Sequence, residues 1–125
     1  MHWADHTAMR LSKQYDSQVI ASGITPSGEF HIGHLREILT AEMIHRACLD
    51  AEIDSEYIFI VDSMDPLRRV YGFLSEEYQE YIGYPLVNIP APNPDGTPNH
   101  EGGNYANHFL QPFLEALKEI GVHPK

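Results

Sequence analysis

The residues with the clearest capacity for chemistry lie in one ten-residue stretch, from Thr25 to His34. It opens with a proline, a serine and a glycine, which is typical of a loop. His31 and His34 follow, three positions apart, and each imidazole can donate a hydrogen bond to a phosphate oxygen without a permanent charge. Gly33 between them has no side chain, which leaves room for a ligand against the backbone. The stretch predicts a phosphate-binding loop, and a surface histidine pair or a polar helix cap is the alternative interpretation.

Three regular elements must position this loop. Residues 18–22 predict a short buried strand, and residues 32–49 predict a helix because apolar side chains recur at three- and four-residue steps. Residues 56–62 hold five consecutive apolar or aromatic side chains, as in a parallel strand covered on both faces. Together they form a βαβ unit over about residues 18–62, in which ligands bind beyond the carboxyl ends of the strands. The start of the helix should offer unpaired N–H groups and a partial positive charge to a phosphate. The apolar stripe expected on this helix consists of Leu35, Ile38, Leu39, Met43 and Ala47.

The second half of the sequence is less regular. A short helix is predicted over residues 76–81, and an irregular loop rich in proline and glycine over about residues 84–104. A last helix, about residues 105–120, carries Phe109, Phe113, Leu117 and Ile120 on one face, with Gly121 as its stop. We expect the first three of these side chains to form an apolar surface that drives homo-oligomer formation.

Composition and charge set limits on function. The 125 residues include 42% hydrophobic ones, which suits one packed α/β domain. With 18 acidic and 8 basic residues the net charge is −10, so any phosphate contact must come from placed donors rather than from general electrostatic attraction. The single cysteine, Cys48, excludes an internal disulfide. No apolar run approaches the roughly 20 residues that span a bilayer, and the first residues do not resemble a signal peptide, so we expect a cytoplasmic location.

Several motifs resemble one family, in order, along nearly the whole chain. His31-Ile32-Gly33-His34 resembles the His-Ile-Gly-His signature of class I aminoacyl-tRNA synthetases and related nucleotidyl transferases. Six stretches resemble the class I lysyl-tRNA synthetases in particular: residues 2–5, 22–28, 35–37, 62–70, 81–86 and 105–109. The resemblance implies the N-terminal half of a Rossmann-type nucleotide-binding domain, α/β in class, with parallel strands and flanking helices. We expect residues 1–125 to form one partial catalytic domain of this type.

The resemblance also implies an activity and an ATP site. The family activates lysine with ATP, used with Mg²⁺, to lysyl-adenylate, and then charges lysine tRNA. The implied catalytic and ATP-binding residues are Pro26, Ser27, His31, Gly33 and His34. The two histidines would hold the phosphates and Gly33 would make room for adenine. Many members of the family have asparagine where this chain has His34.

The implied lysine pocket involves three other positions. Gly23 and Thr25 would line it. Asp62, at the end of the second predicted strand, has two interpretations of equal standing: it helps to hold the ammonium group of lysine, or together with Asp65 it caps the turn that follows.

The sequence departs from the family pattern at three further places. A family Asp-Asp pair is Asp62-Ser63 here. Some members hold zinc in the long loop, and the corresponding positions here are Ala91, Asn99, His100 and His108. Only His100 and His108 stay as candidate metal ligands, and because structural zinc takes four protein ligands we predict no zinc site. The family's second signature, a Lys-Met-Ser-Lys-Ser-like loop, and its anticodon-binding region do not occur. We therefore expect a fragment of a longer synthetase that is inactive alone.

Two other functions stay open at this point. One is another nucleotidyl transferase with the same His-Ile-Gly-His signature. The other is a stand-alone remnant without catalytic activity that binds nucleotide, lysine or a partner protein.

Overall fold

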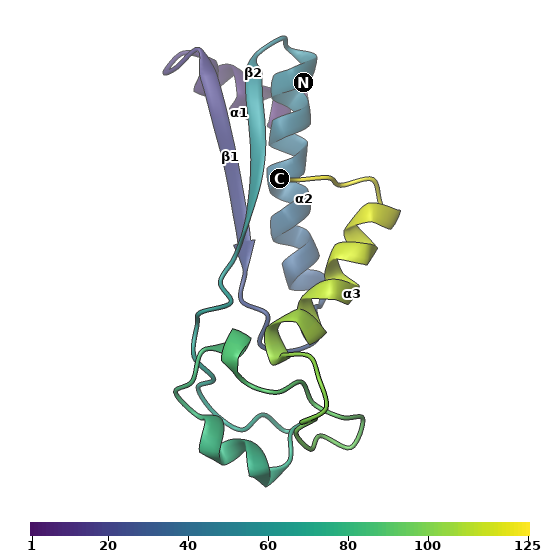
Figure 1. The fold of residues 1–125 in the computed structure, drawn as a ribbon. Helices are drawn as coiled ribbons and strands as arrows, with labels where there is room; N and C mark the ends of the chain where they lie inside the picture. Colours follow the sequence, from purple (N-terminus) through teal and green to yellow (C-terminus); the bar gives the residue numbers. More distant parts are fainter. The chain divides into compact units, whose positions relative to one another are not determined.

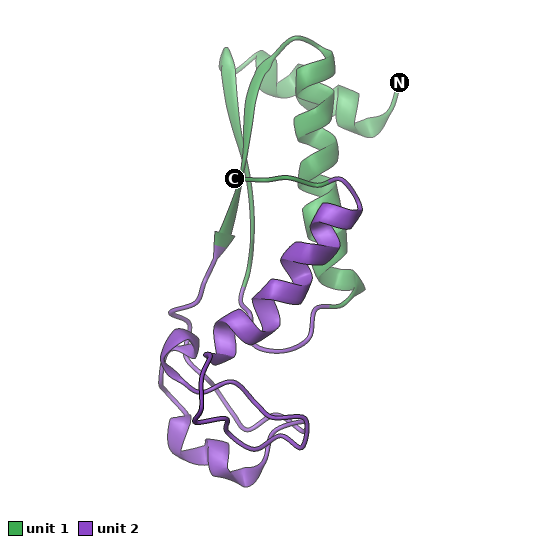
Figure 2. Cartoon of the chain, turned by 45° about the vertical axis from the view of Figure 1, so that its right-hand side comes forward, with its two compact units in different colours: residues 1–24, 31–60, 122–125 green, residues 25–30, 61–121 purple.

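The computed structural model describes residues 1–125 and divides them into two compact units (Figure 2). Unit 1 consists of residues 1–24, 31–60 and 122–125, and unit 2 consists of residues 25–30 and 61–121. The chain therefore passes between the units after residues 24, 30, 60 and 121. Helices and two parallel strands together confirm the predicted α/β class.

Unit 1 contains α1 (Trp3–Ser12), β1 (Ser17–Ile24), α2 (Ile32–Asp50) and β2 (Asp54–Val61) (Figure 1). β1 and β2 pair as a two-stranded sheet, and α2 is the helical connection between them. α1 packs against α2 through Ala4, Ala8, Ala47 and Cys48, and these small side chains let the two helices approach closely. The predicted βαβ order is thus what positions the end of β1 and the start of α2.

β1 extends two residues further than predicted, so Gly23 lies within the strand rather than in the loop. A Cβ atom at this position would come within 2.8 Å of the carbonyl oxygen of Ile60 on β2. Glycine is therefore required for the close approach of the two strand backbones, and the glycine does not mark a turn.

The buried face of α2 differs from the predicted apolar stripe. Leu39 and Met43 are 40% and 39% exposed, whereas Glu42 is only 8% exposed. Glu42 accepts a hydrogen bond from Nε of Arg46 at 2.7 Å, one turn further along the helix. The ion pair lets a carboxylate occupy a buried position, which an alternation of apolar residues does not predict.

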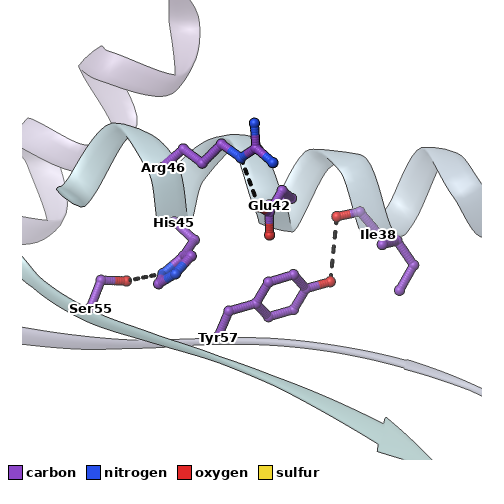
Figure 3. A network of polar contacts seen from close by, with 6 residues as sticks. All are labelled: Ile38, Glu42, His45, Arg46, Ser55 and Tyr57. Atoms are coloured by element: carbon purple, nitrogen blue, oxygen red, sulfur yellow. Dashed lines mark hydrogen bonds and ion pairs between the residues drawn. The ribbon is translucent and has the colours of Figure 1, made fainter. Parts of the chain in front are cut away.

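Polar contacts join α2 to β2 (Figure 3), and a further one joins β2 to β1. The Tyr57 hydroxyl on β2 lies 2.6 Å from Oγ of Ser22 on β1 and 3.4 Å from the carbonyl oxygen of Ile38 on α2. His45 Nδ1 lies 2.8 Å from Oγ of Ser55. Burial raises the pKa of Tyr57, so the phenol stays protonated and can donate. These directional contacts set the rotation of α2 above the strands, which apolar packing alone would leave freer.

Unit 2 contains two short 3₁₀ helices, η1 (Glu76–Tyr81) and η2 (Leu86–Asn88), and the helix α3 (Tyr105–Glu119). Gly121 has a φ of 79°, a left-handed conformation that ends α3 as predicted. The irregular segment before α3 is held by backbone hydrogen bonds, such as the one from the Leu67 N–H to the Tyr84 carbonyl oxygen at 3.0 Å. No helix of the chain combines the length and the apolar character needed to cross a membrane. The core of unit 2 is formed by Leu67, Leu74, Tyr78, Leu86, Ile89, Tyr105, Ala106 and Phe109.

The expected apolar surface on α3 is wrong. Phe109, Phe113 and Leu117 are 8%, 0% and 1% exposed. Two of the rings have aromatic partners within unit 2: Phe30 lies 5.2 Å from Phe113 between ring centroids, and Phe73 meets Phe109 edge-on at 5.6 Å. The homo-oligomer stays a prediction, and these three side chains cannot be its surface.

Candidate functional site

The start of α2 is closed by its own two histidines. His31 is the N-cap residue, and its Nδ1 accepts a hydrogen bond from the Gly33 N–H at 3.0 Å. His34 reaches back, and its Nδ1 accepts from the His31 N–H at 3.1 Å. The two rings stack with centroids 4.0 Å apart and planes inclined by 23°. The pair forms a reciprocal capping box in which imidazoles take the place of the usual hydroxyl and carboxylate.

This cap fixes which nitrogen carries the proton. Because both Nδ1 atoms accept hydrogen bonds from backbone N–H groups, neither can hold a proton, so each neutral ring carries it on Nε2. Burial, and next the neighbouring His31, lower the pKa of His34, while Glu37 acts in the opposite direction. At neutral pH the His34 ring is therefore uncharged, with its proton on Nε2.

The cap also changes two expectations. The Gly33 N–H is taken by His31, and the His34 N–H bonds to the His31 carbonyl oxygen at 3.0 Å, so these two backbone groups are not the unpaired donors that we expected. A Cβ atom on Gly33 would lie 2.8 Å from Cε1 and 2.9 Å from Nδ1 of His31. Gly33 thus makes room for the capping ring of this chain, whatever it does for a ligand.

A cavity of about 390 Å³ opens in unit 1 between β1 and α2. Glu37 Oε1 accepts a hydrogen bond from the N–H of Gly23 at 3.3 Å, which ties α2 to the end of β1. Sequence reasoning gave Glu37 no role of its own. The signal that could have indicated this role is spacing. Glu37 belongs to a stripe of α2 residues at three- and four-residue steps, and these residues line the cavity. The lining residues are Ile20, Ala21, Ser22, Gly33, Arg36, Glu37, Thr40, Ala41 and Ile44.

Within unit 2, the loop of residues 25–30 is anchored by α3. Pro26 is fully buried, and the carbonyl oxygen of Ser27 accepts a hydrogen bond from the hydroxyl of Tyr105. Phe30 packs on Phe113. Tyr105 is completely buried, which raises the pKa of its phenol well above the usual range and keeps it a donor. Sequence reasoning recognised Tyr105 only as part of a motif, and its role as the anchor of Ser27 was missed.

The acidic residues after β2 show no turn cap. Asp62 is exposed and has no side-chain hydrogen bond, while Asp65 Oδ1 accepts from Nη2 of Arg68 at 3.2 Å. The interpretation of these two acids as caps is not what the structure shows. A role of Asp62 or Thr25 toward lysine stays a prediction.

The structure does not bring the candidate metal ligands together. His108 lines a second cavity, in unit 2, to which His100 does not contribute. No three His, Cys, Asp or Glu side chains of the chain lie where they could share a metal ion. The residues present therefore do not fit a structural zinc site, which takes four protein ligands.

Comparisons with known proteins place the chain in one family. The family model described as "tRNA synthetases class I (K)" matches residues 1–125. A lysine–tRNA ligase of Methanosarcina barkeri is 46% identical over 125 residues, which is 100% of this chain and 22% of the relative. Lysine–tRNA ligases of Archaeoglobus fulgidus and Methanocaldococcus jannaschii are 51% and 46% identical, each over 98% of this chain and over 24% and 22% of their own length.

The chain thus spans less than a quarter of the length of these relatives. The match still covers every element described above, the capping histidines and the anchored loop included. A family model that matches the chain from end to end shows its family: the chain belongs to the class I tRNA synthetases of the lysine type.

Proposed function

We propose that this chain supplies the ATP- and lysine-binding elements of a class I lysine–tRNA ligase. In the first step a carboxylate oxygen of lysine bonds to the α-phosphorus of ATP, the bond between the α-phosphorus and the bridging oxygen breaks, and pyrophosphate leaves. In the second step a ribose hydroxyl of the tRNA attacks the carbonyl carbon of the adenylate, its proton is lost, and AMP leaves. Neither step needs a covalent bond to the protein, so the residues act by positioning and by stabilising charge.

The observation that carries the proposal is the pair of Nε2–H donors at the head of α2. Negative charge moves onto the leaving pyrophosphate as the reaction proceeds, and donors held by a helix cap can meet it without reorganisation. Placed donors also suit a chain with a net charge of −10, which has few cations to place around a triphosphate. The partial positive charge at the start of a 19-residue helix acts in the same direction.

Support for the lysine site comes from the cavity beside β1. Glu37 is a carboxylate in its lining, and a carboxylate is the natural partner of an ammonium group. Only one of its oxygens is used by the Gly23 N–H, so the other is available to a substrate ammonium. Gly23 then contributes through its backbone, and Thr25 and Asp62 are further expected contributors.

Magnesium enters this scheme as part of the substrate. Mg²⁺ prefers phosphate oxygens and water and usually takes only one or two carboxylates from a protein. The chain gathers no acidic cluster of its own, which is consistent with an ion that arrives on ATP. In this proposal the residues of the chain bind the nucleotide and leave the ion to the phosphates.

The proposal is tested in a chimera in which residues 1–125 replace the matching segment of the Methanosarcina barkeri lysine–tRNA ligase. We expect lysine-dependent exchange of pyrophosphate into ATP, within about tenfold of the parent enzyme. A chimera that folds, binds ATP and lysine, and exchanges no pyrophosphate would favour the non-catalytic remnant.

A second test uses residues 1–125 alone. Nitrogen-15 chemical shifts of the His31 and His34 rings at pH 7.5 should report protons on Nε2, and ATP should perturb both Nε2 signals. No lysylation of tRNA is expected from this chain alone, because it spans less than a quarter of the matching ligases. Protons on Nδ1, or ATP that leaves both rings unperturbed, would remove the assignment of these histidines to the phosphates.

A further inference from the structure

The second cavity of the chain lies entirely within unit 2 and has a volume of about 570 Å³. One wall is a stripe of α3, and the facing wall is the loop of residues 91–103. The stripe consists of residues spaced as one helix face, opposite the buried face that carries Tyr105 and Phe109. The lining residues are Ala91, Pro92, Asn93, Pro94, Asn99, Gly102, Gly103, Asn104, Asn107, His108, Gln111 and Pro112.

Most of the exposed lining is apolar, its polar part comes from amide and imidazole groups, and no lysine, arginine, aspartate or glutamate lines it. Five of the lining residues carry a side-chain amide, which offers both donors and acceptors. A site without lysine, arginine or carboxylate has nothing to neutralise a phosphate or an ammonium group. The chemistry of the cavity therefore selects an uncharged ligand with donors and acceptors close together.

Three of the amides are oriented by the chain itself. The Oδ1 atoms of Asn99 and Asn104 accept from the backbone N–H groups of Glu101 and Asn107, at 2.9 Å and 2.8 Å. Asn93 donates through Nδ2 to Oγ1 of Thr97 at 3.1 Å. These contacts leave Nδ2 of Asn99, Nδ2 of Asn104 and Oδ1 of Asn93 for a ligand, already held in place.

Two more amides have no partner in the chain. Asn107 and Gln111 are exposed on the α3 stripe, and the structure shows no side-chain hydrogen bond for either. The ring of His108, between them, is exposed and meets Phe109 edge-on at 4.8 Å. This imidazole and three prolines add apolar ring surface to the lining, against which a planar ligand can pack.

We infer that this cavity binds an unpaired nucleobase, with adenine as its best ligand. Adenine presents a donor and an acceptor side by side, and asparagine and glutamine amides recognise that edge in a bidentate manner. Proteins hold single-stranded bases by stacking them on ring side chains. A peptide backbone offers similar donors and acceptors but no planar ring for these surfaces. The inference goes beyond the proposed function, because the residues of this cavity are assigned neither to phosphate nor to lysine.

The test is titration of ¹⁵N-labelled residues 1–125, followed through the side-chain NH₂ signals of asparagine and glutamine. The probes are adenosine, cytidine, a single-stranded RNA of five adenines, and a capped alanine tripeptide. We expect adenosine and the RNA to shift signals of Asn99, Asn104, Asn107 and Gln111, with cytidine weaker. Shifts confined to unit 1, none at all, or a stronger response to the tripeptide would overturn the inference.

Variants sharpen this test without disturbing the fold. Asn107→Ala with Gln111→Ala removes two exposed side chains that make no internal hydrogen bond, and should weaken the RNA about fivefold to tenfold. Gln79→Ala, an exposed glutamine of η1 outside the cavity, is the matched control and should change nothing. Equal affinity of the double variant and the unchanged chain would contradict the inference.

Two further measurements show whether the bound base belongs to an RNA strand or to a free nucleoside: the salt dependence of RNA affinity, and the affinity for RNA compared with that for adenosine. Because no cation lines the cavity, the affinity for the RNA should stay constant between 50 and 200 mM salt, whereas binding through phosphates would fall steeply. Tighter binding of the RNA than of adenosine assigns the base to a strand, and equal binding assigns it to a free nucleoside. Both results support a base site. His31→Ala should leave this binding intact, so its outcome is independent of the proposed catalysis.

Discussion

The helices α2 and α3 both begin with a side-chain N-cap, which is a histidine at α2 and an asparagine at α3. At α2, Nδ1 of His31 caps the Gly33 N–H, and at α3, Oδ1 of Asn104 caps the Asn107 N–H. An imidazole keeps an Nε2–H donor and can take up a second proton at its capping nitrogen, while an amide keeps an NH₂ donor and does not titrate. The first residue after the cap also differs: Ile32 is 81% exposed and Tyr105 is fully buried.

The comparison teaches that a capping side chain uses only one of its polar atoms for the cap. At α2 the cap consumes the acceptor of each ring and leaves the donor, which suits a phosphate. At α3 the cap consumes the acceptor of an amide and leaves a neutral donor, which suits an uncharged ligand. The start of α2 is exposed to solvent, whereas the start of α3 is anchored in a core.

The largest expected effect is that of His31→Ala in the chimera with the Methanosarcina ligase. Loss of a preorganised donor to a charge that develops in the transition state costs about 3–4 kcal/mol, or roughly 100- to 1,000-fold in rate. The measurement is lysine-dependent pyrophosphate exchange, with the rate constant and the Michaelis constant for lysine separated. A change in the lysine constant alone would show that His31 does not act on the phosphates.

Two variants serve as references for that result. His34→Asn should be milder, because asparagine keeps a donor and is common in the resembled family. Thr25→Ala should act mainly on the Michaelis constant for lysine. Equal rate losses in all three variants would point to a general loss of structure.

Tyr105→Phe should have the next largest effect, on stability. The substitution keeps the buried ring but leaves the Ser27 carbonyl oxygen without its donor, which costs about 1–3 kcal/mol. Urea unfolding of residues 1–125 measures this loss. Tyr15→Phe, at a tyrosine that is 71% exposed, is the control and should lie near zero. Equal effects of the two variants would show that the Tyr105 hydroxyl does not anchor the loop.

Asn104→Ala should remove the cap of α3 and lower the free energy of unfolding by about 1 kcal/mol. The loss should be the same at pH 5.5 and pH 7.5, since an amide does not titrate in this range. Asn88→Ala, at an exposed asparagine without a side-chain hydrogen bond, is the comparison. A loss that changes with pH would mean that the cap of α3 is coupled to a titrating group.

The smallest expected effect is a pH dependence at α2. The pKa of His34 in the folded chain lies below its ordinary value of 6.5, so the unfolded chain binds more protons in the window below pH 6.5. The contribution of the neutral ring is complete above pH 6.5 and is lost as the pH falls through the lowered pKa. His34→Asn should flatten the dependence of unfolding free energy on pH between 7.5 and 5.5. An unchanged slope in this variant would assign the dependence to other histidines.

The features that follow from local signals were predictable. α2 begins at Ile32 as expected, because the glycine, the histidines and the apolar steps that set its start are near neighbours in sequence. The place of Gly23 within β1 depends on the Ile60 carbonyl, and the burial of Phe113 depends on Phe30. Such contacts join distant positions, and no local pattern predicts them.

The candidate site divides in the same way. His31 and His34 were found because their spacing in the chain is itself the signal. Glu37 and Tyr105 act through Gly23 and Ser27, which lie 14 and 78 positions away. Their residue types are common on any helix, so only the folded chain shows which of them matter.

The repeated passage of the chain between its two units limits how this sequence can be recombined with a relative. A single crossover after residue 60 would separate Ser27 and Phe30 from Tyr105 and Phe113, which hold them in unit 2. Residues 25–30 and 61–121 should therefore be exchanged together, although they are not contiguous in the sequence. A graft that takes both from the same parent, and leaves β1 and α2 from the other, keeps every one of these pairs intact.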